Sequence, residues 1–526
     1  MASENSSTVF DFFYLPHIHN YVSHESGLLV VPPSLAAALV FGAVLLIYTL
    51  LLEPLFFGRS AQIPGPKLAG LSWYYLTYFD LKLKRNEKIG EWHRKYGPVV
   101  RIRPNEVTVA DPADFREVYD TKSKYDKTKY FKRFALYGED NLFSTEKYVE
   151  HQAKKRKIAH DYTKSRVVLN AEALVRERIA ALLKQFKEAP NGLVDVFILF
   201  DCFSHDVMTR FLYGEKHGTN AIEDRNDRPL VVNLKRSQIY TPIWVNFPRL
   251  HGSWLLNRML GPEYERTGEA GGDVKRHIET IMRKHDSDPH HDEFYSLYRT
   301  MRYAKPDADG KPMSRNYMAS EMYDHLKAGQ QTTASTLTYL TWRLSRHPEW
   351  QRRLQHELRA LPVSDTNDLS LADLEALPVL NAVIRETLRL HPAASGRGER
   401  IVSSGGRTYS GVFVPAGTTI IGPNLVVHQN PSAFSDAFSW CPERWINASA
   451  EEMKAMEYSF VPFGHGARIC IGQNLAMMEL RLLVGSMYRA CSTELGESCS
   501  DDSMYQLGSL AAVPRALKCE LYFKEE

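Results

Sequence analysis

Several features are scarce in this sequence, and each scarcity excludes a class of protein. The 526 residues include only six cysteines, which are widely spaced and form no CxxC pair of the kind that holds zinc or carries dithiol chemistry. The net charge is only +3, and no basic arm with interleaved aromatic residues is present, so we expect no nucleic-acid partner. We find no complete GxGxxG motif and no P-loop, so no nucleotide-binding domain is predicted.

Basic residues are also absent from the start of the chain, where a long apolar run lies. No Lys or Arg precedes Arg59, whereas a cleaved signal peptide begins with a basic stretch, so cleavage is not expected. The run from Leu35 to Leu52 is almost wholly apolar and has about the length that a bilayer-spanning helix needs. A buried core helix is the alternative, but we predict one transmembrane helix within residues 27–57.

The distribution of charge predicts the orientation of this helix. Acidic residues precede it and basic residues follow it, which by the positive-inside rule places the short tail in the lumen and the rest of the chain in the cytosol. The expected location is the endoplasmic reticulum membrane, crossed once, where the sequon at Asn5 would be a glycosylation site. The predicted organisation is a lumenal tail (1–26), an anchor (27–57), a proline-rich hinge (58–67) and one large soluble domain (68–526).

Most of the soluble part has the pattern of α-helices. Five segments place apolar residues three or four positions apart, as amphipathic helices do. They are Asn170–Phe186, Val274–Lys284, Asn316–Arg346, Glu349–Leu361 and Leu377–Leu390. Alternating patterns bounded by Gly and Pro predict strands within Val99–Asp111, Arg407–Gly422 and Leu517–Phe523. The predicted fold class is therefore mainly α with small β-sheets.

A glycine-rich loop near the C-terminus carries the strongest chemical signal. It reads FGHGARICIG, from Phe463 to Gly472, and is followed by a helical pattern. Its glycines permit close approach to a flat macrocycle, and Arg468 can form charge-assisted hydrogen bonds with a carboxylate. The helix that begins after Cys470 points its positive end at the sulfur, which favours a thiolate, and Phe463 is expected to pack beside it. The alternative is a loop that merely buries a cysteine.

This loop resembles the haem-binding signature of the cytochrome P450 superfamily, Phe-x-x-Gly-x-Arg-x-Cys-x-Gly. All five fixed positions are present, at Phe463, Gly466, Arg468, Cys470 and Gly472. The resemblance extends from the hinge to the C-terminus and implies a single cytochrome P450 fold. It also implies haem b as the cofactor, with Cys470 as the axial thiolate ligand of the iron. Strings such as LPVLNAVIRETLRLHP are similar to those of fungal microsomal members.

A second motif of the family consists of Glu386 and Arg389, one helical turn apart, together with Arg444. The resemblance implies that these three form a buried triad, which is tolerable only where the charges satisfy one another. We therefore assign the three residues to a structural lock behind the haem rather than to catalysis. The family has Phe where this chain has Trp445, a mild departure.

A third motif, Ala328–Thr333, resembles the oxygen-binding groove of the family. The resemblance implies that small residues let the helix pass close over the haem and that the hydroxyl of Thr332 delivers protons to dioxygen. The family usually has an acid before this threonine, whereas here Gln331 takes its place. Both Thr332 and Gln331 are counted as catalytic candidates, with Gln331 expected to act mainly by holding water. Because an amide has no proton to relay near neutral pH, the predicted route runs through Thr332 and water. A lone helical threonine more often bonds back to its own helix.

Three basic residues are candidates for contacts with the haem propionates. Arg400 matches a propionate-binding arginine of the family, and either Lys155 or Arg156 is expected to supply a second contact. The sequence does not decide between these two. The same basic run would attract the acidic surface of a reductase, although such runs are normally solvated.

The resemblance implies a monooxygenase that inserts one oxygen atom from dioxygen into a lipophilic small molecule, expected to be a secondary-metabolite intermediate. NADPH would act indirectly, through a separate haemoprotein reductase. The segments expected to touch the substrate are Phe131–Tyr137, Ser237–Trp254, Ala393–Glu399 and Leu507–Leu510. Two other functions stay open. One is a haem-thiolate isomerase or dehydratase that needs no dioxygen, in which Thr332 would have little purpose, and the other is a membrane-bound haem carrier or sensor.

Overall fold

The computed structural model describes residues 33–525, apart from residues 292, 306–311, 363–368 and 509. The predicted lumenal tail and its sequon at Asn5 lie outside the described residues. The chain divides into two compact units, residues 1–61 and residues 62–526. In the first unit, α1 (Pro33–Ile47) continues as a π-helix, η1 (Tyr48–Phe57). The stretch Ser34–Glu53 is long and apolar enough to cross a membrane, and none of it is buried within the protein.

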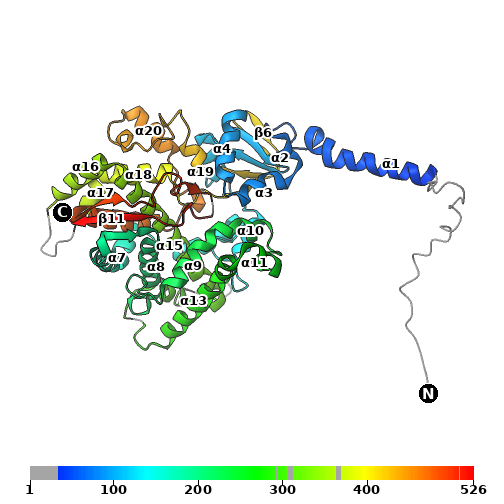
Figure 1. The fold of residues 1–526 in the computed structure, drawn as a ribbon. Coiled ribbons are helices and arrows are strands. Elements are labelled where there is room, and N and C mark those ends of the chain that lie inside the picture. The colour runs from blue at the N-terminus through cyan, green and yellow to red at the C-terminus, as the bar shows by residue number, and fades with distance from the viewer. Residues whose placement is uncertain (1–32, 292, 306–311, 363–368, 509, 526) are drawn as a thin grey trace, which may run out of the picture. The chain divides into compact units, whose positions relative to one another are not determined.

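The second unit is mainly helical, which confirms the predicted fold class (Figure 1). Its longer helices are α4 (Arg85–Tyr96), α6 (Tyr148–Ile158), α7 (Lys164–Lys187), α8 (Val196–Tyr213), α13 (Ala270–Ser287), α15 (Arg315–Arg346), α16 (Pro348–Arg359), α18 (Pro378–Leu390), α20 (Ala450–Ser459) and α21 (Gln473–Ala490). Its shorter helices are α2 (Lys67–Leu71), α3 (Trp73–Leu81), α5 (Pro112–Tyr119), α9 (Arg228–Arg236), α10 (Thr241–Asn246), α11 (Trp254–Leu260), α12 (Pro262–Gly268), α14 (Leu297–Arg302), α17 (Leu371–Ala376) and α19 (Asn424–His428).

The strands of the described residues form four small sheets. The largest has the order β1 (Val99–Arg103), β2 (Glu106–Val109), β7 (Thr419–Ile421) and β4 (Arg400–Ile401), with β2 and β7 parallel. A second has the order β3 (Leu193–Asp195), β11 (Glu520–Glu525) and β8 (Cys491–Leu495). The other two pair β5 (Arg407–Tyr409) with β6 (Val412–Val414) and β9 (Gln506–Leu507) with β10 (Val513–Pro514). The largest sheet therefore joins segments far apart in the chain and fixes the position of Arg400.

Helix α15 runs through the main apolar core of this unit. It packs most extensively against α8, and α7 packs against both α8 and α21, as Figure 1 shows for the neighbouring ribbons of α7, α8 and α15. The five predicted helices are confirmed as α7, α13, α15, α16 and α18. Helix α8 was not predicted, because it is buried along nearly its whole length and so has no amphipathic pattern.

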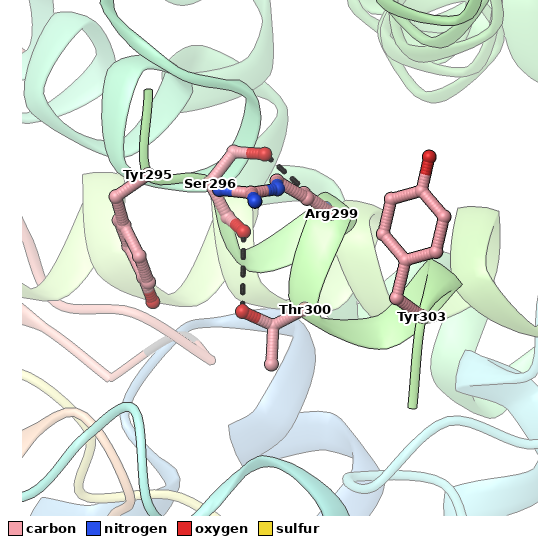
Figure 2. Close-up of a pocket in the computed structure, with 5 residues that line it drawn as sticks. All are labelled: Tyr295, Ser296, Arg299, Thr300 and Tyr303. Carbon is pink, nitrogen blue, oxygen red and sulfur yellow. Dashed lines mark hydrogen bonds between the residues drawn. The ribbon is translucent and has the colours of Figure 1, made fainter. Parts of the chain in front are cut away.

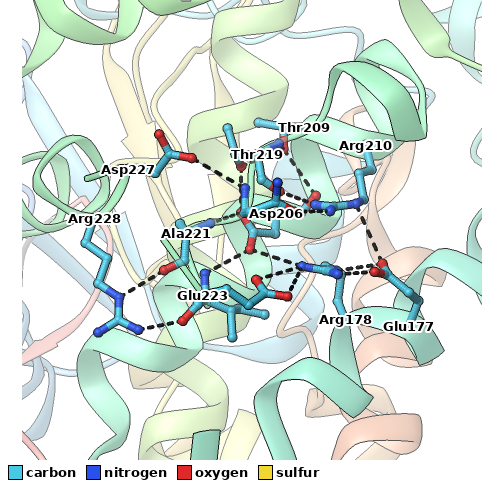
Figure 3. A network of polar contacts seen from close by, with 12 residues as sticks. Glu177, Arg178, Asp206, Thr209, Arg210, Thr219, Ala221, Glu223, Asp227 and Arg228 are labelled. Atoms are coloured by element: carbon cyan, nitrogen blue, oxygen red, sulfur yellow. Dashed lines mark hydrogen bonds and ion pairs between the residues drawn. The ribbon is translucent and has the colours of Figure 1, made fainter. Parts of the chain in front are cut away.

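A buried carboxylate holds the connection between α8 and α9. Asp206 of α8 accepts hydrogen bonds from the hydroxyl of Thr219 at 2.6 Å and from the N–H groups of Ala221 at 2.8 Å and Ile222 at 3.1 Å. Arg178 of α7 lies 3.8 Å from the same carboxylate (Figure 3). Burial raises the pKa of Asp206 to about 6, and these hydrogen bonds act in the opposite direction. The network fixes the segment that leads into α9, a helix that borders the site described below.

Part of the predicted hinge is packed against β1. The N–H of Arg101 donates to the carbonyl of Pro64 at 2.7 Å, and Ile63 is buried. A Cβ at Gly65 would collide with the carbonyl oxygen of Arg101, so only glycine lets the chain approach the strand this closely. Residues 63–65 are thus a fixed part of the second unit.

Candidate active site

The glycine-rich loop connects α20 to α21 and folds back on itself. The N–H of Cys470 donates to the carbonyl of Phe463 at 2.9 Å, which closes the loop. The side chain of Phe463 is half-buried and packs against the main core. Gly466 has a φ of 68°, and a Cβ there would collide with the carbonyl oxygen of Tyr119. Glycine is required at this position, and the loop thereby holds Cys470 just before α21.

The side chain of Cys470 is accessible although the residue lies deep in the protein. Burial raises the pKa of its thiol, while the N–H groups of Gly472 and Gln473, which donate to the sulfur, and the nearby Lys155 lower it. These N–H groups lie at the start of α21, so the positive end of the helix points at the sulfur. Because burial outweighs these groups and the pKa is raised overall, the thiolate needs a bound metal ion to share its charge.

Four basic side chains lie near this loop, and each disfavours the charged form of its neighbours. They are Lys127, His151, Arg400 and Arg468. Burial and the charges of Arg468 and Arg400 hold the pKa of Lys127 well below its usual value. Burial and neighbouring cations, Arg468 and Lys127 among them, lower the pKa of His151 to about 2. Burial, together with Arg400, lowers the pKa of Arg468 to about 9. Because buried cations tolerate one another only when an anion lies between them, the cluster is suited to bind an anionic group.

The two arginines of this cluster are oriented by neutral groups. Arg468 donates from Nη1 to the carbonyl of Thr145 at 2.9 Å and from Nη2 to that of Glu146 at 2.7 Å. Its buried Nε has no hydrogen-bond partner among the described residues. Arg400 donates from Nη1 to the carbonyl of Glu399 at 2.9 Å. Carbonyl oxygens fix the direction of a guanidinium without neutralising it, so both arginines retain their charge for a ligand.

The structure separates Lys155 from Arg156, between which the sequence left a choice. The ammonium of Lys155 donates to the carbonyls of Ala467 at 3.0 Å and Ile469 at 3.4 Å, on either side of Arg468. Arg156 is exposed. Lys155 therefore contacts the loop that carries Cys470, and Arg156 lies on the surface, where a partner could meet it.

Helix α15 has an accessible stretch in its buried middle. Ala328 is exposed and Thr332 is partly exposed, although the helix is otherwise largely buried there. A Cβ at Gly329 would collide with the side chain of Met208 of α8, so a larger residue would have to displace that side chain. The hydroxyl of Thr332 donates to the carbonyl of Ala328 at 2.8 Å, the back-bonded arrangement. Its oxygen can still accept a hydrogen bond from the cavity side.

Gln331 makes its contacts with α9 and not with Thr332. Its buried amide donates to the carbonyl of Leu234 at 3.2 Å. The ammonium of Lys235 lies 3.3 Å from the backbone carbonyl of Gln331 and forms an ion pair of 3.0 Å with Asp201 of α8. Both charged side chains are almost completely buried. Gln331 and this ion pair, which sequence reasoning missed, thus tie α9 and α8 to the groove.

A cavity of about 640 Å³ lies beside Ala328 and Thr332. Apolar and aromatic side chains form the larger part of its wall, and it reaches α15, α12 and α13. All four segments predicted to touch the substrate contribute to it, through residues that include Phe134, Trp244, Ala394 and Leu510. The structure therefore brings these segments together around one apolar space next to Thr332.

Glu386, fully buried in α18, lies at the centre of the predicted triad. Arg389 donates to its two oxygens at 2.8 and 2.7 Å, and Nε of Arg444 donates to Oε1 at 3.3 Å. The indole N–H of Trp445 donates to Oε2 at 2.9 Å, and the N–H of Cys441 donates to Oε1 at 2.9 Å. The structure thus brings the three charges together, and Trp in place of Phe adds one donor to the buried carboxylate.

Replacing Trp445 with Phe tests this added donor. We expect the free energy of unfolding to fall by about 1.5–3 kcal/mol, as for hydrogen bonds to charged groups, measured from the urea midpoint of the haem-loaded protein. Trp440→Phe is a matched control, because the indole of Trp440 donates at 3.3 Å to the neutral hydroxyl of Thr387. Its expected cost is about 0.5–1.5 kcal/mol. Equal losses in the two variants would contradict a special role for Trp445.

Comparison with known proteins decides the family. The sequence model of the family described as Cytochrome P450 matches residues 64–519. This chain belongs to the cytochrome P450 family. It is 31% identical to Cytochrome P450 monooxygenase FGM1 of Gibberella zeae, over 89% of this chain and 93% of the relative. It is 29% identical to Cytochrome P450 monooxygenase stcB of Emericella nidulans, over 89% of each chain. It is 26% identical to Tryptophan 6-hydroxylase fscE of Fusarium equiseti, over 86% of this chain and 90% of the relative.

The chain is accordingly a P450 monooxygenase, and its family implies a haem iron with a thiolate ligand, a redox partner and a small-molecule substrate. The residues present fit such a group. Cys470 offers an accessible sulfur in a deep position. The cluster around Arg400 and Arg468 is suited to two carboxylates, and Ala328 leaves space against α15.

Two members of the basic cluster, His151 and Lys127, were not predicted from the sequence. His151 precedes Lys155 by one helical turn in α6, so the i, i+4 spacing was an available signal. Lys127 lies in a loop and has no such signal. Its ammonium donates to the carbonyl of Phe143 at 2.5 Å and lies over the ring of Phe131 at 4.4 Å, contacts that only the fold creates.

A second hollow, of about 460 Å³, lies around the start of α14 (Figure 2). The hydroxyl of Ser296 accepts from the N–H of Arg299 at 3.1 Å, and Thr300 donates to the carbonyl of Ser296 at 3.4 Å. These are helix-capping contacts. The hollow shares no lining residue with the cavity of the P450 site.

Proposed function

We propose that this P450 inserts one oxygen atom from dioxygen into a lipophilic small molecule, with Cys470 as the axial ligand of haem b. Electrons would come from NADPH through a haemoprotein reductase. The observation that carries the proposal is the position of Cys470 before α21, where the N–H groups of Gly472 and Gln473 donate to its sulfur. Haem bound there supplies the activation of dioxygen, with electron density pushed from the thiolate.

The chain's own groups have separate tasks in this proposal. Arg400 and Arg468, assisted by Lys127, bind the propionates by charge-assisted hydrogen bonds. Lys155 holds the carbonyls of the ligand loop. The Oγ1 hydroxyl of Thr332 holds a proton beside the cavity for delivery, and water reprotonates it afterwards. Gln331 positions α9 against this region through its bond to Leu234.

A secondary-metabolite intermediate is the substrate that we propose. Support comes from the relatives, which are fungal monooxygenases and include one named for the hydroxylation of tryptophan. The apolar wall of the 640 Å³ cavity fits a molecule with a large apolar body.

The substrate is first identified by deleting the gene in its host. The metabolite that accumulates in the deletion strain is the candidate substrate for the decisive experiment. The purified P450, a reductase and NADPH are then given that metabolite under labelled dioxygen. We expect one labelled oxygen atom per product molecule and no turnover without NADPH. Turnover without NADPH or label would support a haem-thiolate isomerase or dehydratase, and haem binding without any turnover would support a carrier or sensor. The partly exposed hydroxyl of Thr332 beside the cavity favours the monooxygenase.

We also propose that Ser34–Glu53 anchors the chain in the endoplasmic reticulum membrane with the catalytic part in the cytosol. The support is an apolar helix with no buried residues and the absence of Lys and Arg before Arg59. In sealed microsomes, added protease should digest the catalytic part and spare the N-terminal tail. Protection of the catalytic part until detergent is added would reverse the orientation.

A further inference from the structure

The cavity beside Thr332 contains two opposite charges that the proposed reaction does not use. Asp324 and Lys327 both line it from α15, in a wall that is otherwise largely apolar. Neither side chain forms a hydrogen bond or an ion pair with any part of the chain that the structure describes. Burial raises the pKa of Asp324 to about 6 and lowers that of Lys327 to about 8. Charges held in this way are costly unless a ligand neutralises them.

The carboxylate of Asp324 belongs to a cluster of titratable groups beside the cavity. Asp324, Glu321 and His325 bring their carboxylate and imidazole atoms within 4.8 Å of one another. Glu321 is fully buried, and neither of its oxygens has a hydrogen-bond partner among the residues that the structure describes. The imidazole of His325 lies 3.5 Å from Glu321 and is also bonded to the hydroxyl of Tyr162 at 2.5 Å. The charges of Lys127 and Lys327 also favour the ionised form of Asp324, but neither forms a hydrogen bond or an ion pair with it among the described residues. The cavity side of the carboxylate is therefore open to a cation that binds it directly.

The spacing along α15 sets the direction of a bound molecule. Asp324 and Lys327 are three residues apart, so they lie on one side of the helix. They precede Thr332 by eight and five residues, which at 1.5 Å per residue is about 12 and 7.5 Å along the helix axis. The charges therefore lie toward one end of the cavity, and the groove at Thr332 lies toward the other.

We propose that this cavity selects a zwitterionic substrate, whose protonated amine binds Asp324, whose carboxylate binds Lys327 and whose apolar body extends toward Thr332. The substrate class is an amino acid, or a derivative with a free amine and a free acid, that carries a large apolar side chain. Its oxidised carbon lies remote from the charged head. The inference rests on the proposed function for the reaction, whereas the binding preference can be measured without turnover.

Four probes that share one apolar body measure the contribution of each charge to binding. They are homophenylalanine, 3-phenylpropylamine, which lacks the carboxylate, 4-phenylbutanoate, which lacks the amine, and propylbenzene, which lacks both. Dissociation constants are measured by calorimetry on the haem-loaded protein, and the absorption spectrum identifies any amine that ligates the iron directly. We expect the zwitterion to bind roughly tenfold more tightly than either singly charged probe, or more, as charge-assisted hydrogen bonds would give.

Neutral variants assign each contact. Asp324→Asn should weaken the binding of homophenylalanine and of 3-phenylpropylamine roughly tenfold and leave the binding of 4-phenylbutanoate unchanged. Lys327→Gln should weaken the binding of homophenylalanine and of 4-phenylbutanoate roughly tenfold and leave the binding of 3-phenylpropylamine unchanged. Arg133→Gln is the matched control, because Arg133 also lines the cavity but is exposed, where water screens its charge. It should change no affinity by more than about threefold. Propylbenzene should bind equally well to all four proteins.

The measured thermal stability distinguishes binding from a structural role. Because neither side chain forms a hydrogen bond or an ion pair with the described residues, Asp324→Asn and Lys327→Gln should be at least as stable as the parent. Equal binding of all four probes, or destabilised variants with unchanged probe preferences, would overturn the inference. Failure of the proposed function would give a different result from failure of this inference. The thiolate carbonyl band or the NADPH-dependent oxidation would then be absent, while the preference for the zwitterionic probe persisted.

Discussion

We expect Cys470→Ser to abolish the red-shifted band of the reduced carbonyl complex and the NADPH-dependent oxidation. The hydroxyl of serine is not ionised near neutral pH and donates far less charge to iron than a thiolate does. Loss of groups that merely orient a metal ligand already costs roughly 10–100-fold, so loss of the ligand itself should lower turnover more than about 100-fold. The carbonyl spectrum and the haem content of the purified protein are the measurements.

Cys441→Ser is the matched control for this prediction. Cys441 is half-buried and contributes its backbone N–H to Glu386, a bond that serine retains. The Cys441→Ser variant should keep the red-shifted carbonyl band and the turnover of the parent. A thiolate band that survives in Cys470→Ser, or disappears in Cys441→Ser, would show that the ligand has been assigned to the wrong cysteine.

The features that could be predicted from the sequence are those in which neighbours in the chain carry the signal. The loop from Phe463 to Gly472 contains its sulfur, its turns and its arginine within ten positions, and the start of α21 follows at once. Glu386 and Arg389 lie on one turn of α18. Amphipathic periodicity located α7, α13, α16 and α18, because each buries one face, and it also located α15, although that helix is largely buried.

The features that could not be predicted arise where separate segments meet. Lys127 lies in a loop, and its place among Arg400, Arg468 and His151 has no periodic pattern in the chain. The ion pair of Asp201 with Lys235 joins α8 to α9, and neither helix has a motif that marks it. Sequence reasoning also grouped Gln331 with Thr332 in catalysis, whereas the structure places its amide against Leu234 of α9.

The two charged residues of the cavity could not be predicted from the sequence for the same reason. Asp324 and Lys327 fall within a long helix whose other polar residues are common surface types, so nothing in the sequence marks them as interior. They line a cavity only because segments as distant as Phe134, Trp244 and Leu510 close over α15. The general class of reaction follows from a contiguous motif, while the choice of substrate depends on long-range packing.

Thr332→Ala should separate the consumption of NADPH from the formation of product. The hydroxyl of Thr332 donates to the carbonyl of Ala328, which fixes its oxygen toward the cavity, where it can accept a proton from water and pass one on. Positioned acid groups contribute roughly 10²–10⁴-fold, and water can replace part of this, so we expect product per NADPH to fall roughly ten- to hundredfold. Peroxide release should rise correspondingly, and haem content should stay unchanged.

Companion variants decide whether the hydroxyl itself is responsible. Thr332→Ser retains the hydroxyl and should restore most of the coupling, while Thr332→Val retains the shape and should behave as Ala does. Gln331→Ala should have a much smaller effect on coupling, because its amide cannot titrate and is engaged with Leu234. Its loss should instead loosen the contact of α9 with α15 and weaken substrate binding. Unchanged coupling in Thr332→Ala would mean that another group delivers the proton, and equal uncoupling in Gln331→Ala would make the amide an essential link in that route.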